Sequence, residues 1–122
     1  MYLTILLYFG KLSIMNSSTT AVWEKNDAKQ FARALADITD ETGIQNFLRD
    51  VMTEKEIIEM SARLQAATML SQGKKYSEII ATTKLSSRTV ARISNWLKNG
   101  TGGYRQVITG AHHSHLPPAR AE

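Results

Sequence analysis

The chain has 122 residues and no cysteine, so it is long enough for one small domain and cannot form a disulfide scaffold, a thiolate zinc site or a thiol nucleophile. Its composition, 43% hydrophobic and 21% charged, is typical of a folded globular protein. The net charge of +4 is divided unevenly: residues 24–59 carry nine acids and five bases, whereas residues 73–105 carry seven bases and one acid, which favours an anionic partner for the second half.

The first 22 residues are predicted to lie outside the folded domain. The apolar run at residues 2–10 is shorter than the roughly 18–20 residues that a membrane span needs, and no clear signal-cleavage site follows it. Because Met15 opens a polar stretch, we interpret residues 1–22 as a disordered extension or as the product of a start codon assigned too early. A weak membrane-associated N-terminus is the alternative. We otherwise expect a cytoplasmic protein.

Two amphipathic helices are predicted at the start of a helical domain that spans residues 23–109. Apolar residues at three- and four-residue steps place the first helix over residues 26–38, with Asn26 or Asp27 as its cap. Asp40 is the expected cap of a second, shorter helix.

A third helix, predicted from Thr53 to about Gln72, is the longest. Thr53 and Glu56 have the spacing of a capping box, and Gly73 is expected to end the helix in the left-handed conformation. The helix carries one apolar stripe, formed by Ile57, Met60, Leu64 and Ala67. Its length predicts that it spans the core or a subunit interface.

Two short helices, predicted at residues 77–83 and 87–98, have the pattern of a helix-turn-helix. Ala81 is small where the second helix is expected to cross the first. Ser86 is placed to cap the second helix, and Val90 is placed to anchor it in the core. A helical hairpin with an accidental Ser/Thr/Arg-rich face is the alternative interpretation.

The second of these helices is expected to enter the major groove of DNA with its N-terminal half. The residues predicted to contact bases are Ser87, Arg88, Ala91 and Arg92. The residues predicted to contact phosphates are Lys74, Lys75, Ser77, Lys84, Thr89 and Lys98. Lys84 stands where glycine commonly supplies a positive φ, a substitution that costs about 1 kcal/mol if the conformation is kept.

The C-terminal segment gives little signal. Residues 105–109 are too short to assign, and residues 110–122, with three His and two Pro, are predicted to be a disordered tail. A metal site at these histidines is not expected, because they lack paired ligands in a folded segment.

Residues 53–105 resemble the tryptophan-repressor-like family, and within it the uncharacterised YerC/YecD branch. The resemblance is carried by Phe47, Leu48, Arg49, Asp50, Arg63, Gly73 and the segments 76–79, 86–93 and 100–104. It implies an all-α, intertwined homodimer with two helix-turn-helix heads that read a near-palindromic operator. The implied function is that of a sequence-specific transcriptional regulator, expected to be a repressor.

The resemblance also implies a small-molecule pocket, formed by Thr53, Arg63, Thr89 and Arg92. In the family the indole of tryptophan lies between two arginines, which correspond to Arg63 and Arg92. This chain has Ile93 in place of a glycine and Trp96 in place of a small serine. We therefore predict that the added bulk fills the pocket, that tryptophan does not bind and that no cofactor is needed. The alternative for both arginines is contact with acids or phosphates.

Two rival functions belong to other classes. A helical module that binds an acidic protein predicts no specific DNA affinity. An enzyme is not expected, because the chain has no glycine-rich phosphate loop, no nucleophile elbow and no metal-ligand cluster in a segment predicted to fold. The paired carboxylates Glu54 and Glu56 are explained by helix capping.

Overall fold

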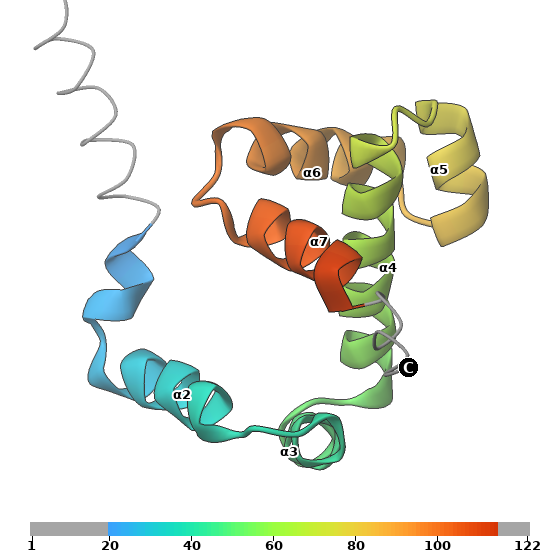
Figure 1. Ribbon diagram of the computed structural model, residues 1–122. Helices are drawn as coiled ribbons and strands as arrows, with labels where there is room; N and C mark the ends of the chain where they lie inside the picture. Colours follow the sequence, from blue (N-terminus) through green and yellow to red (C-terminus); the bar gives the residue numbers. More distant parts are fainter. Residues whose placement is uncertain (1–19, 115–122) are drawn as a thin grey trace, which may run out of the picture. The chain divides into compact units, whose positions relative to one another are not determined.

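The computed structural model describes residues 20–114, and within that range the protein is entirely helical, with no β-strand (Figure 1). The elements are η1 (Ala21–Glu24, a 3₁₀ helix), α2 (Asn26–Asp37), α3 (Glu41–Val51), α4 (Glu54–Ser71), α5 (Tyr76–Thr83), α6 (Ser87–Asn99) and α7 (Gly103–Ser114). They divide after Thr53 into an N-terminal unit, η1 to α3, and a C-terminal unit, α4 to α7. The predictions for residues 1–19 and 115–122 lie outside the described residues.

The N-terminal unit has no buried residue, although both of its α-helices are amphipathic. The rings of Phe31 and Phe47 contact each other with centroids 5.9 Å apart, which joins α2 to α3. The predicted cap of α3 is confirmed, because the Asp40 carboxylate accepts a 2.7 Å hydrogen bond from the Gly43 N–H. This unit therefore has a capped start of α3 and an aromatic contact between its helices, but no buried core.

The predicted cap of α2 is wrong. The helix begins at Asn26, and its N-cap is Lys25, which makes no side-chain capping bond. The Asp27 carboxylate, inside the first turn, accepts from the Ala28 N–H at 2.9 Å. The start of α2 thus lies one residue earlier than a cap at Asn26 requires, and two residues earlier than a cap at Asp27 requires.

The C-terminal unit contains the buried core. α4 packs against α5 and α6, and α7 packs on α4 and α6 (Figure 1). The buried apolar residues are Ala66, Ala67, Ile79, Val90, Ile93 and Ile108. Val90 is 0% exposed, which confirms its predicted anchoring role. Of the stripe predicted on α4 only Ala67 is buried, and Met60 and Leu64 are exposed, because in the C-terminal unit the core meets only the second half of this helix.

The end of α4 follows a local signal. Gly73 has φ +75°, and the Lys74 N–H donates to the Met69 carbonyl at 3.1 Å, so the predicted left-handed end of α4 is confirmed.

Helix α7 was not predicted. Gly102, with φ +88°, precedes it, and the Gln106 N–H donates to the Gly102 carbonyl at 3.0 Å. The Arg105 Nε donates to the Leu97 carbonyl at 2.9 Å and so ties α7 to the end of α6. α7 fills the unassigned residues 105–109 and continues to Ser114, inside the segment predicted as a tail.

Candidate nucleic-acid interface and adjoining pocket

Helices α5 and α6 are joined by a tight turn that is held by hydrogen bonds on both sides. The Lys84 N–H donates to the Ile80 carbonyl at 2.9 Å, and Lys84 has φ +61°, so the left-handed conformation that glycine commonly supplies here is kept. The Thr83 hydroxyl donates to the Ile79 carbonyl at 2.7 Å and accepts from the Leu85 N–H at 3.3 Å. Thr83 therefore bridges the turn from a buried position.

The crossing of α5 and α6 differs from the prediction at one residue. Ala81 is exposed, whereas Ile79 and Thr83 form the buried face of α5. The residues of α5 that face the core are thus four apart, and Ala81 lies between them on the outer side of the helix.

Helix α6 begins at a confirmed cap and presents an exposed polar face. The Ser86 Oγ accepts from the Thr89 N–H at 3.1 Å, and the hydroxyls of these two residues are 2.9 Å apart. The four residues predicted to contact bases are all exposed, namely Ser87, Arg88, Ala91 and Arg92. Contact with bases stays a prediction, but the structure brings these residues together on the first turns of one helix.

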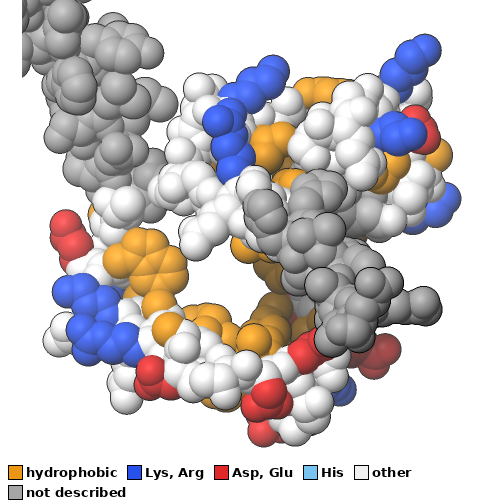
Figure 2. All heavy atoms as spheres, viewed as in Figure 1, with side chains coloured by type: hydrophobic (Ala, Val, Ile, Leu, Met, Phe, Trp, Pro, Cys, Tyr) orange, Lys and Arg blue, Asp and Glu red, His pale blue; other side chains and the backbone are white. Residues whose placement is uncertain are grey.

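The residues predicted to contact phosphates lie around this helix pair. Lys74 forms an ion pair with Glu78 at 3.9 Å. No ion pair is found in residues 20–114 for the other lysines of this set, Lys75, Lys84 and Lys98, which are exposed. Ser77 is exposed and Thr89 is half-buried. Figure 2 shows Lys and Arg side chains projecting from the α5–α6 end of the C-terminal unit, so this end has a positive potential.

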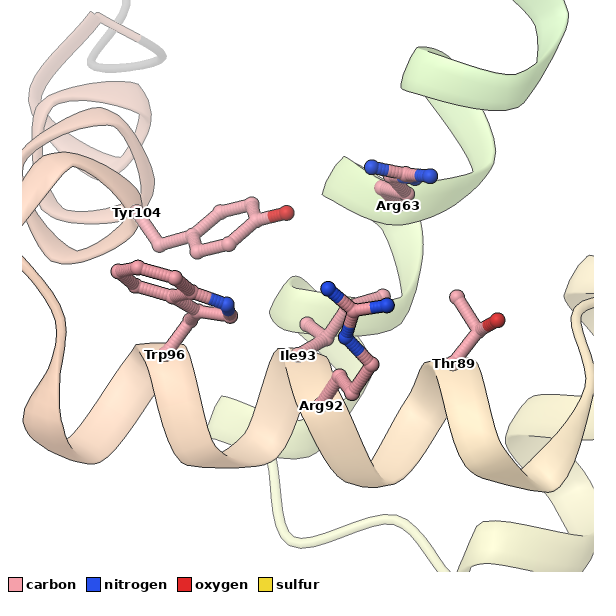
Figure 3. A pocket seen from close by; sticks show the side chains of 6 residues that line it. All are labelled: Arg63, Thr89, Arg92, Ile93, Trp96 and Tyr104. Atoms are coloured by element: carbon pink, nitrogen blue, oxygen red, sulfur yellow. The ribbon is translucent and has the colours of Figure 1, made fainter. Parts of the chain in front are cut away.

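A pocket of about 240 Å³ opens beside the same helix. It is lined by Arg63, Thr89, Arg92, Ile93, Trp96 and Tyr104. Figure 3 shows four of these side chains rising from successive turns of α6, with Arg63 reaching in from α4 and Tyr104 from α7. Ile93 is 4% exposed, whereas Trp96 is 43% exposed and forms one wall.

The two arginines give the pocket its charge. The Arg63 Nη2 is 2.9 Å from a Glu59 carboxylate oxygen, but its Nε is buried and has no hydrogen-bond partner. Arg92 has no ion pair with any residue in the described part of the chain. Because no carboxylate lines the pocket, an acceptor-rich anion is the ligand chemistry that these groups favour.

The predicted filling of this pocket is wrong, because a cavity remains beside Ile93 and Trp96. The added bulk changes the shape of the pocket and does not close it. Thr53, the fourth residue of the predicted site, lies in the N-terminal unit, and its role in the pocket stays a prediction.

The role of Tyr104 in this site was missed from the sequence. It belonged to a glycine-rich segment that carried the family resemblance but had no assigned role. Gly100 also contributes, since a Cβ there would overlap the Trp96 carbonyl oxygen and lie 2.9 Å from the indole Cε3. Of the glycines in this segment, Gly100 is the one whose backbone comes close to an aromatic side chain, that of Trp96, whereas nothing lies within 4 Å of a Cβ built at Gly102 or Gly103.

A second cavity of about 430 Å³ lies on the other side of the Trp96–Tyr104 wall. Its lining is mainly apolar and consists of Leu64, Trp96, Thr101, Gly102, Gly103, Tyr104 and Val107. Leu64 and Val107 are exposed, so this surface of the C-terminal unit is open in the single chain.

The architecture of the C-terminal unit, with two short helices joined by a tight turn and packed on a long helix, is that of the helix-turn-helix class. The chain belongs to the Trp repressor family: the family model described as Trp repressor protein matches residues 26–111. No helix in the described range is long and apolar enough to cross a membrane.

Two relatives extend this assignment. The chain is 28% identical over 79 residues to "Uncharacterized protein YerC" of Bacillus subtilis (strain 168), a match that covers 65% of this chain and 76% of that protein. It is also similar to the crystal structure of a TrpR-like protein from Eubacterium eligens ATCC 27750, with a TM-score of 0.67 and 28% identity. That match covers 76% of this chain and 94% of the other. The expected all-α fold of this family is therefore confirmed.

Proposed function

We propose that this protein is a sequence-specific DNA-binding transcriptional regulator, acting as a repressor in the cytoplasm. The observation that carries the proposal is the exposed face of α6, where Arg88 and Arg92 stand on a helix that contains no acidic residue. A guanidinium on such a face can donate two hydrogen bonds to a guanine edge. Membership of the Trp repressor family supports this function and supports a regulatory rather than an enzymatic role.

The proposed active form is a homodimer that reads two half-sites. The N-terminal unit has no buried residue, and Val22, Trp23 and Phe31 are all exposed. Figure 2 shows this apolar surface over η1 and α2. Amphipathic helices of this kind bury their apolar face against another surface. In a dimer, the second copy can supply that surface with its open apolar cavity beside Trp96. Two recognition helices one helical turn apart then match a near-palindromic operator.

The test is selection of duplex DNA from a random pool by the full chain, followed by binding of the selected sequence across salt concentrations. We expect a near-palindrome whose affinity falls steeply as salt rises, because Lys and Arg contacts release counterions from phosphates. A pool that stays random at low salt and protein excess, both with and without small anions added as effectors, overturns the proposal. That result favours the alternative, a helical module that binds an acidic protein partner.

A second proposal concerns the pocket between α4, α6 and α7. We propose that it takes a small anionic effector and excludes L-tryptophan. The buried, unpartnered Arg63 Nε and the unpaired Arg92 support an anion. Ile93 and Trp96 line the cavity where the family has a glycine and a serine, which supports a shape that does not accept an indole. Calorimetric titration with L-tryptophan should show no heat of binding, and micromolar affinity would overturn this exclusion.

A further inference from the structure

The turn of the helix-turn-helix contains a strained residue. Lys84 has φ +61° and ψ +13°, and it is the one non-glycine residue with positive φ in the described range. The left-handed region is unfavourable for a residue with a Cβ, and glycine adopts it without that penalty. The turn therefore reduces the stability of the fold as long as lysine occupies it.

The strain cannot relax through local movement, because the residues on both sides are fixed. Thr83 is buried and bridges the turn through its hydroxyl, which bonds the Ile79 carbonyl and the Leu85 N–H. Leu85 packs against the core, and Ser86 caps α6. Lys84 thus holds its conformation before any partner arrives.

The Lys84 side chain makes no ion pair or hydrogen bond that offsets this strain within the described residues. It is exposed, and the ion pairs of the C-terminal unit join Arg63 to Glu59 and Lys74 to Glu78. Of these, the Lys74 pair removes part of the positive charge at the start of α5, so the ammonium of Lys84 is one of the free cations beside the first turn of α6.

We propose that Lys84 is a pre-positioned phosphate contact, whose strained backbone lowers stability and whose ammonium raises affinity for DNA. This inference rests on the proposed DNA-binding function and adds a residue-specific coupling to it. A lysine fixed in one backbone conformation loses less entropy when it binds a phosphate than a lysine in a flexible loop. The same residue therefore affects folding and binding in opposite directions.

The variants Lys84→Gly and Lys84→Asn separate the two effects, because glycine and asparagine both tolerate left-handed backbone and neither carries charge. We expect Lys84→Gly to raise the melting temperature by about 4 °C. We expect both variants to bind a duplex of about 30 base pairs roughly five- to tenfold more weakly per bound copy at low salt. The slope of log affinity against log salt should fall by about 0.9 per copy. Lys55→Gln, which removes an exposed charge at the start of α4, is the matched control and should change neither quantity.

Each outcome is decisive. If the wild-type chain binds the duplex and both Lys84 variants bind with the same affinity and salt slope, the phosphate contact is overturned while the proposed function stands. If affinity falls but the melting temperature of Lys84→Gly does not rise, the opposing effect on stability is overturned. A wild-type chain with no salt-dependent binding overturns the proposed function itself and this inference with it.

Discussion

The N-terminal and C-terminal units have similar helices and opposite degrees of burial. α2 and α3 are as clearly amphipathic as α6, yet neither has a buried residue, whereas α6 buries Val90, Ile93 and Ser94. The units also differ in charge: residues 20–53 carry six acids and four bases, whereas residues 54–114 carry four acids and nine bases.

This difference shows that an apolar stripe specifies a helix face but not the surface that covers it. In the C-terminal unit the face is covered within the chain, by α4, α5 and α7. In the N-terminal unit the Phe31–Phe47 contact is the one described pairing of aromatic rings, and the other apolar side chains of the face are half-buried or exposed. Burial inside the chain predicts intrinsic stability, and burial between copies predicts stability that depends on concentration.

The largest expected effect is on the core of the C-terminal unit. Ile79→Ala truncates a side chain that is 0% exposed, so it should lower the free energy of unfolding by about 2–4 kcal/mol. Urea denaturation followed by circular dichroism measures this change. Thr82→Ala, on the exposed side of the same helix, should change it by less than about 0.5 kcal/mol. Equal losses in both variants would contradict the difference in burial.

A substitution on the basic face tests the contrast in charge. Arg88→Ala should weaken binding to the selected DNA by about 1–3 kcal/mol and relax the preference at one base position. Arg33→Ala is the control: it removes an exposed arginine from α2 instead of α6, and it should leave the base preference unchanged. Binding to a library of single-base variants measures both. Unchanged preferences in Arg88→Ala would show that α6 docks in another orientation.

The N-terminal unit is expected to respond through association. Phe31→Ala removes a ring that is 38% exposed in the single chain, so it should weaken dimerisation by about tenfold, or ~1.4 kcal/mol. Sedimentation equilibrium measures the dissociation constant, and the neighbouring Gln30→Ala is the control. A wild-type chain that stays monomeric at every concentration would remove the proposed reason for the exposed face.

The smallest expected effect is at the exposed ion pair. Glu78→Gln breaks the 3.9 Å contact with Lys74, and both side chains are about half exposed, so stability should change by less than about 0.5 kcal/mol. The same change frees Lys74 and should raise DNA affinity slightly. Thermal melting and a salt titration of binding measure the two effects, and a loss of several degrees would reveal a structural role for Glu78.

Local signals made three of the helix ends predictable. Asp40, Ser86 and Gly73 each fix a terminus through a hydrogen bond or a backbone conformation confined to a few residues. The core was less predictable. Ala81 was assigned to the crossing but is exposed, and Ile58 and Met60 in the first half of α4 are apolar but exposed, because periodicity does not reveal which surface meets a given face.

Helix α7 and the pocket depend on tertiary contacts that have no local pattern. α7 begins with glycines, and its ordered start uses Arg105 bonded to the Leu97 carbonyl of another helix. The family resemblance identified the arginines of the pocket. Tyr104 could not be assigned to it from the sequence, because its position depends on helix α7, which was not predicted. The size of the remaining cavity likewise depends on how Trp96 packs over Gly100, which residue volumes alone do not give.

The chain contains two tryptophans, and the structure places one in each unit: Trp23 in η1 and Trp96 at the wall between the two cavities. Each is partly exposed, so its fluorescence responds to anything that covers it. Replacing one or the other by phenylalanine leaves a single emitter in a known place. Covering of the N-terminal helices and occupation of the Trp96 pocket can then be followed separately in the same protein as its concentration, its DNA or its ligand is varied.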